Sequence, residues 1–181
     1  MEQKNLSKIF WTEALTGGLI VGIGLFVWEL IGYWLNLPEK HSGVVSFVQF
    51  VILIAGIIYF CRRLRDFRGQ AIGFPYTVVF GFILSMMLFT GIVYGAGQFF
   101  LQAVIAPAYY DGIFEATIVN SSFDENLTEL MLSMRPMMKN PFIMILSGIF
   151  SFVIYGGLIG LLAAAFLQRP PAPRNHLNPE M

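Results

Sequence analysis

Charge is scarce in this sequence. Charged residues make up 12% of the 181 amino acids, whereas soluble domains carry about 25%. Hydrophobic residues make up 56%. This composition excludes an ordinary soluble domain and indicates that most side chains face lipid or other helices. The formal net charge is zero, so nothing in the composition points to a nucleic-acid partner.

Cysteine and histidine are almost missing. Cys61 is the one cysteine, so no intrachain disulfide can form. His41 and His176 are solitary, and the sequence has no metal-ligand cluster, nucleophile elbow or phosphate-cradling glycine loop. The paired aspartates or serine–histidine pair of an intramembrane protease are missing as well. We therefore predict no metal, no cofactor and no enzymatic activity.

Four long apolar stretches dominate what is present. A hydrocarbon core of about 30 Å needs about 20 apolar residues to cross it as a helix, and a helix satisfies its own backbone there. The predicted spans are residues 14–35, 44–61, 74–106 and 141–167. We predict an all-α, polytopic membrane protein: a single four-helix transmembrane domain over residues 1–168 and a disordered, proline-rich tail over residues 169–181.

Basic residues predict the orientation of these spans. Eight of the eleven lie in the N-terminal tail, the loop after the second span and the C-terminal tail. The three on the other side are Lys40, Arg135 and Lys139. Because lysine and arginine concentrate in cytoplasmic loops, we expect both termini in the cytoplasm and the acidic loop 107–140 outside it. Asp111 and Glu115 of this loop are expected to be solvated.

The loop 107–140 carries a helical pattern of its own. Ser122–Glu125 fits a capping box, and four apolar residues then recur at helical spacing. They are Leu127, Leu130, Met131 and Met134. We predict a short extracytoplasmic amphipathic helix over about residues 123–134, ended by Pro136, on the outer face of the bundle or in the membrane interface. Asn140 is placed to cap the last span before Pro141.

The third span is longer than a membrane requires. A helix over residues 74–106 is about 50 Å long, so it must tilt, kink or project beyond the bilayer. Gly91, Gly95 and Gly97 offer places to bend.

Small residues recur at the four-residue spacing that lets membrane helices approach closely. The pairs are Gly18 with Gly22, Gly91 with Gly95, and Gly156 with Gly160. Two interpretations stay open. The pairs either pack the four helices of one chain together, or receive a second copy or a helix of a partner.

Glu29 is the one ionisable residue that we place inside a predicted span, about 9 Å below its outer boundary. Intramembrane carboxyls are costly and mark candidate functional sites. Matching depths across the spans predicts an intramembrane polar layer of Glu29, Gln49, Tyr94, Gln98, Gln102 and Ser147.

Three interpretations of this layer compete. It is a hydrogen-bonded lock with Glu29 protonated, since a low-dielectric environment disfavours the charged form. Alternatively it is a polar cavity for a headgroup or small solute, or a proton-coupled transport site. The absence of further ionisable groups in spans two to four, and of internal repeats, counts against transport.

The basic cluster after the second span comprises Arg62, Arg63, Arg65 and Arg68. It acts as a topology signal. It could also bind anionic lipid headgroups or phosphates.

Two segments resemble a known bacterial family. The first is Leu64–Asp66 with Gly69–Phe74, followed by an apolar helix, and the second is Asn140–Ser147, followed by a small-residue span that ends with Ala163–Phe166. Over about residues 8–168 the chain resembles the domain-of-unknown-function family DUF4199, found mainly in Bacteroidota. The sequence departs from the family pattern before the third span, where it has Gly73-Phe74-Pro75 instead of Gly-Gly-Tyr and Phe-Gly.

The resemblance implies four spans, an inner-membrane location and no assigned activity or catalytic residues. It also implies an accessory subunit beside membrane glycosyltransferases that act on polyprenyl phosphates. We therefore expect a non-enzymatic inner-membrane accessory or scaffold protein, whose partner is another membrane protein, a second copy or anionic lipid. The alternative is a small transporter or a lipid- or headgroup-binding protein that uses the layer around Glu29.

Overall fold

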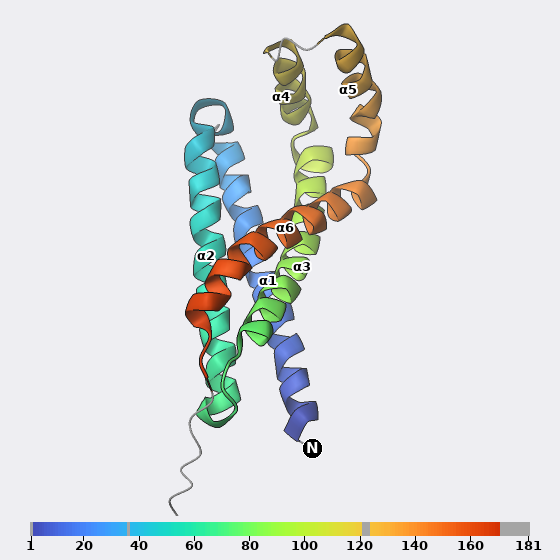
Figure 1. The fold of residues 1–181 in the computed structure, drawn as a ribbon. Helices are drawn as coiled ribbons and strands as arrows, with labels where there is room; N and C mark the ends of the chain where they lie inside the picture. The colour runs from blue at the N-terminus through green and yellow to red at the C-terminus, as the bar shows by residue number, and fades with distance from the viewer. Residues whose placement is uncertain (1, 36, 121–123, 171–181) are drawn as a thin grey trace, which may run out of the picture.

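The computed structural model describes residues 2–35, 37–120 and 124–170, and helices account for almost all of this part of the chain (Figure 1). The elements are α1 (Glu2–Trp34), α2 (Leu37–Ile72), α3 (Tyr76–Phe99), the π-helix η1 (Phe100–Ile105), α4 (Pro107–Asn120), α5 (Glu125–Met138) and α6 (Pro141–Leu167). One isolated backbone bridge is the only extended pairing within these ranges. The predicted all-α fold is confirmed for the described residues.

Four helices are long and apolar enough to cross a membrane, as predicted. They cover Asn5–Trp34, Gly43–Arg68, Tyr76–Ile105 and Pro141–Leu167. The last has the predicted bounds. The first two run past the predicted limits because their polar flanking residues continue the helix. The arginine cluster, predicted as a loop, therefore belongs to the last turns of α2.

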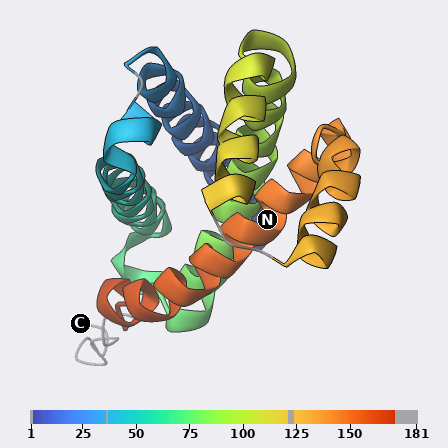
Figure 2. The ribbon, with the colours of Figure 1, turned by 90° about the horizontal axis from the view of Figure 1, so that it is seen from above.

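The spans pack in the spatial order α2, α1, α3, α6, and α6 crosses α3 obliquely (Figures 1 and 2). Contacts between α2 and α6 are sparse. Large buried side chains fill the space between α1, α2 and α3; they include Leu25, Ile57, Phe60, Phe82 and Met86. The outward face of α6 is uncovered, and Phe166 is 86% exposed. Lipid tails match such an apolar face.

Glycines set the distance between α3 and α6. A β-carbon on Gly91 would lie 2.7 Å from the backbone oxygen of Gly148, and one on Gly95 would lie 2.7 Å from the Cα of Ile145. The other predicted glycines also face helices of the same chain: Gly18 faces Phe89, Gly22 faces Val93, Gly156 faces Met87 and Gly160 faces Ile83. All six therefore lie at contacts within the chain.

The third span is distorted after its glycines, not at them as predicted. α3 stays α-helical through Phe99 and then widens into η1, where the Ala106 N–H donates to the Leu101 oxygen five residues back at 2.9 Å. Ala106 leaves the helical region, with φ of −137° and ψ of 48°, and α4 begins at Pro107. Gly91 and Gly95 cannot provide the bend because they are packed against α6.

A short backbone pairing ties the turn between α2 and α3 to the end of α6. The Phe74 N–H donates to the Arg169 oxygen at 2.8 Å, and the Arg169 N–H donates back at 2.9 Å. Gly73 precedes this pairing with a φ of 72°, a conformation that suits glycine. This end, which also holds the start of α1, is called the N-terminal end, and the opposite end carries α4 and α5 (Figure 1).

The segment 107–140, predicted as a loop with one short helix, contains two helices. α5 begins at Glu125 and continues through Pro136 to Met138, so Pro136 does not end it. Ser122 and Phe123 of the predicted capping box lie outside the described residues, as does the tail after residue 170. The predicted cap of α6 is confirmed: the Asn140 side-chain oxygen accepts the Phe142 N–H at 2.9 Å.

Candidate functional site: an intramembrane polar layer and an arginine groove

The polar layer centres on Glu29 of α1. Its carboxylate oxygen Oε2 accepts hydrogen bonds from the Tyr94 hydroxyl and the Gln98 amide, both on α3. The Gln102 amide in turn donates to the Gln98 oxygen at 2.8 Å. These three α3–η1 residues recur every four positions, which places them on one face of the helix. The layer thus joins α1 to α3 inside the predicted spans.

Gln49 and Ser147 reach the layer from the other two spans. The Gln49 side chain of α2 approaches the Tyr94 hydroxyl. Ser147 of α6 lines a cavity together with Gln98 and Gln102. The structure thus brings the six residues of the predicted layer near one another, and of these Tyr94 and Gln98 bond directly to Glu29.

Two partly open cavities adjoin the layer. The α3–α6 cavity, of about 260 Å³, is lined by polar residues of both helices, including Gln102 and Ser147. The α2–α6 cavity, of about 290 Å³, is lined by Gln49 and mostly apolar neighbours. Tyr94 and Phe152 line both cavities, and their rings meet edge to face with centroids 5.1 Å apart. The layer is therefore bordered by space large enough for part of a ligand.

Tyrosines at the start of α4 lie over the layer. The Tyr33 ring of α1 packs on Tyr109 with centroids 5.1 Å apart, and Tyr109 packs on Tyr110 at 5.3 Å. Burial, followed by the nearby charge of Glu29, raises the pKa of Tyr110. The aromatic cluster therefore lies close to Glu29 on the side of α4.

The four arginines at the N-terminal end do not form one uniform basic patch. Arg63 pairs with Glu13 of α1 at 3.0 Å, and the Glu13 side chain is only 8% exposed. Arg65 lies 3.6 Å from Asp66, and the Arg68 Nε donates to the Gly73 oxygen at 3.3 Å. Glu13 lies in the first apolar helix, one residue before the start predicted for the first span.

Arg62 differs from the other three arginines. In the part of the chain that the structure describes, its guanidinium has no ion pair or hydrogen bond, and it is exposed. It lines a groove of about 500 Å³ between α2 and α6 whose other lining residues are apolar. We call this cavity the arginine groove. Sequence spacing alone could not distinguish Arg62 from its neighbours, because the partners of Arg63 and Arg68 come from α1 and from the turn after α2.

The family described as protein of unknown function DUF4199 has a model that matches residues 16–169 of the chain. The chain belongs to the DUF4199 family. The match extends over the polar layer and the arginine groove. No curated protein and no solved structure matches the chain. A role for this DUF4199 chain must therefore be argued from its own site geometry.

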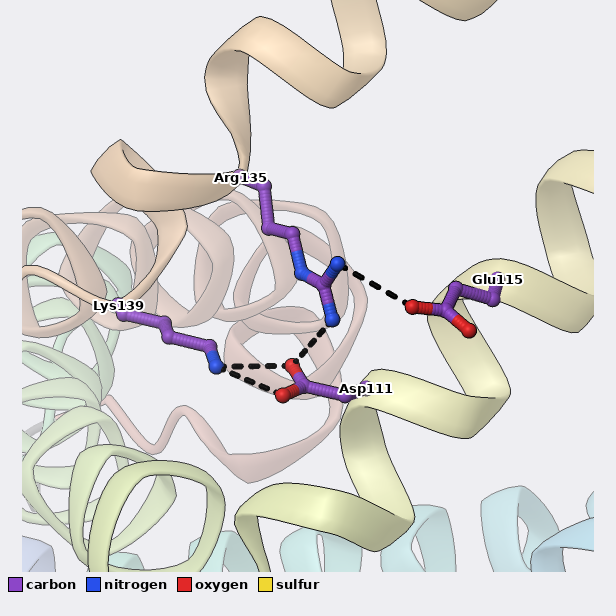
Figure 3. Close-up of polar contacts among 4 residues, drawn as sticks. All are labelled: Asp111, Glu115, Arg135 and Lys139. Carbon is purple, nitrogen blue, oxygen red and sulfur yellow. Dashed lines mark hydrogen bonds and ion pairs between the residues drawn. The ribbon is translucent and has the colours of Figure 1, made fainter.

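An ion cluster outside the spans fixes the two short helices of this DUF4199 chain to each other (Figure 3). Arg135 of α5 lies 3.2 Å from both Asp111 and Glu115 of α4, and Lys139 lies 2.8 Å from Asp111. Lys139 and then Arg135 lower the pKa of Asp111, and Asp111 raises that of Arg135. Asp111 and Glu115 are thus paired with cations, contrary to the expectation of simple solvation. Their four-residue spacing on one helix was the available signal.

Proposed function

We propose that this chain is a non-enzymatic accessory protein of the membrane that holds the polar part of a lipid or small solute in the α3–α6 cavity. The observation that supports it is the cavity of about 260 Å³ beside the Glu29 hydrogen bonds. A layer whose whole purpose is to lock helices together gains nothing from adjacent empty space, because unfilled space forfeits dispersion contacts.

The lining of the α3–α6 cavity indicates the chemistry of the ligand. Within the described residues, the Gln102 carbonyl oxygen and the Ser147 hydroxyl make no hydrogen bond to protein. One is an acceptor and the other both donates and accepts. Neither is charged. They suit a neutral group with hydroxyl, ester or amide functions, such as the glycerol and ester region of a lipid.

Co-purified lipids provide the test of this proposal. The full chain is isolated in mild detergent, and its bound lipids are identified by mass spectrometry. We expect Ser147→Leu, which fills the cavity, to remove the lipid that the unaltered protein retains. Ser85→Leu is the matched control, because Ser85 of α3 lies apart from the cavity and donates to the Gly81 oxygen of its own helix.

The Glu29→Gln variant distinguishes lipid binding from a role in which the Glu29 carboxyl gains and loses a proton. A glutamine still accepts hydrogen bonds from Tyr94 and Gln98, so we expect this variant to fold and to keep the lipid. Loss of function at normal abundance would favour a titrating carboxyl and hence transport. Identical lipid content in the unaltered protein, Ser147→Leu and Ser85→Leu would contradict the binding proposal.

We propose further that the protein lies in a bacterial inner membrane with both termini in the cytoplasm. The excess of basic residues at the N-terminal end supports this orientation. The start of α1, the turn between α2 and α3 and the end of α6 lie at that same end of the molecule (Figure 1). Reporter fusions at residues 120 and 170 are expected to report opposite compartments. The same compartment for both would overturn the topology.

A scaffold role is the second candidate, and α5 is the element that favours it. Among the described side chains of this helix, Leu132 and four further large apolar ones are exposed, and those four are Leu127, Leu130, Met134 and Met137. They recur at helical spacing on an arm that stands beside the spans, which suits a membrane-protein partner such as an envelope glycosyltransferase, or a second copy. Affinity capture from native membranes should then recover a partner that Leu130→Glu loses. Capture that is unchanged by Leu130→Glu would reject this surface.

A further inference from the structure

The arginine groove and its surroundings lie at the opposite end from the α4–α5 arm. Three of the four clustered arginines are held by groups of the same chain, and Arg62 is not. A guanidinium with five donors and no protein partner, placed beside an apolar groove, is electrostatically complementary to a phosphate attached to a hydrocarbon chain.

The shape of the groove fits one acyl chain. Its lining includes Phe50, Ile54 and Ile58 of α2, facing Ile159, Leu162 and Phe166 of α6. From Phe50 to Arg62 the helix rises about 18 Å at 1.5 Å per residue. One leaflet is half of a hydrocarbon core of about 30 Å, or about 15 Å. A chain in the groove would reach from Arg62 to about the middle of the bilayer.

A second hollow, of about 570 Å³, shares Arg62 and Ile58 with the arginine groove. Its lining combines the polar side chains of Tyr59, Arg63 and Asp66 with the apolar ones of Ala55 and Phe67. The polar side chains suit a headgroup, whereas the groove suits a hydrocarbon chain. Arg62 borders both spaces, which is the position that a lipid phosphate occupies between its headgroup and its chains.

We propose that an anionic phospholipid binds at Arg62, with one acyl chain in the arginine groove, its phosphate on the guanidinium and its headgroup in the adjoining hollow. The site is separate from the α3–α6 cavity, and it stands whether or not that cavity holds a ligand. Arg62 supplies the preference for anionic lipid. The groove favours a lipid over a free anion, because all of its lining residues except Arg62 are apolar and so suit a hydrocarbon chain.

Native mass spectrometry of the full chain in detergent tests this site by titration with dioleoylphosphatidylglycerol or dioleoylphosphatidylcholine. A basic residue near a membrane contributes about a fivefold change in affinity for anionic lipid. We expect the unaltered protein to prefer the anionic lipid by about that factor. Arg62→Gln should bind both lipids equally, whereas Arg62→Lys and the matched control Arg65→Gln should keep the preference.

The groove has a test of its own. Ala163→Phe projects a ring into the groove and should weaken both lipids, with the circular dichroism spectrum unchanged. A preference that survives Arg62→Gln would overturn the proposal. So would displacement of the lipid by inorganic phosphate, since that identifies an anion site without a chain. The protein is also tested for dimer formation when lipid is removed. If dimers form and Ala163→Phe abolishes them, the groove binds a second copy of the chain, and the lipid proposal is overturned.

Discussion

Replacing Gly91 by alanine should force α3 away from α6. The added β-carbon would lie 2.7 Å from the Gly148 oxygen and 2.7 Å from the Ile149 Cα. Ordinary contact begins at 3.4 Å, so the helices must separate locally by about 0.7 Å. Both obstructing atoms are backbone, and no side-chain rotation relieves the clash.

The expected cost of Gly91→Ala follows from two opposing terms. Overpacking of this kind costs about 1–3 kcal/mol, and a gap of 0.5–1 Å forfeits a quarter to a half of each dispersion contact. Alanine recovers up to about 1 kcal/mol relative to glycine through helix propensity. We expect a net destabilisation of about 1–2 kcal/mol. Packing between membrane helices depends on such contacts, because lipid removes the hydrophobic drive.

Unfolding in mixed micelles, followed by circular dichroism as dodecyl sulfate is added, measures this change. Gly81→Ala on α3 and Gly157→Ala on α6 are matched controls, since nothing lies within 4 Å of a β-carbon at either position. Both controls should be neutral or slightly stabilising. A Gly91→Ala protein as stable as Gly81→Ala would refute the close approach of α3 and α6.

Three further predictions concern polar contacts. Arg63→Gln leaves the carboxylate of Glu13 buried without its cation and should lower the free energy of unfolding by about 1–3 kcal/mol. Restoration of stability by a second change, Glu13→Gln, would verify the pairing in the same unfolding assay. Lys139 and Arg135 lower the pKa of Asp111. The ion cluster of these residues therefore stabilises the protein fully at a pH above the ordinary pKa of a carboxyl group, and this stabilisation is lost as the pH falls through the lowered pKa of Asp111. Distances between spin labels on α4 and α5 should therefore lengthen in acid, and Asp111→Asn should lengthen them at neutral pH. Asn140→Ala removes the cap of α6 and should cost about 1 kcal/mol, whereas Asn140→Asp should cost little; equal losses would exclude capping.

The spans could be predicted because length and apolar composition determine them, and α6 has the predicted bounds. α4 was missed because its sequence mixes aromatic and β-branched residues without a clear apolar face. The distortion at η1 was misplaced because Gly91 and Gly95 are packed against α6 and Gly97 against Phe26 of α1. The spacing of the glycines does not show which helix each one faces, because that depends on the tertiary packing.

The polar layer could be predicted as a set because depth and helical spacing are both readable from sequence. Tyr94, Gln98 and Gln102 share a face through that spacing, and Glu29 lies at their depth. The arginine cluster could not be resolved in the same way. Arg65 pairs with the adjacent Asp66, whereas Arg63 and Arg68 have partners on α1 and in the turn after α2, so the unpaired state of Arg62 emerges only in three dimensions.

The wide turn Phe100–Ile105 behaves as one surplus residue in an otherwise regular rod. Each residue of an α-helix advances the chain by about 100° of rotation, since 3.6 residues complete a turn. A π turn closes with one residue more than an α turn, as the bond from the Ala106 N–H to the Leu101 oxygen shows. Deleting a single amino acid there would let the segment return to α-helical spacing and leave the α4–α5 arm close to its present direction. The third span can therefore lose one residue at this point, whereas a deletion in the regular part of α3 would rotate everything that follows.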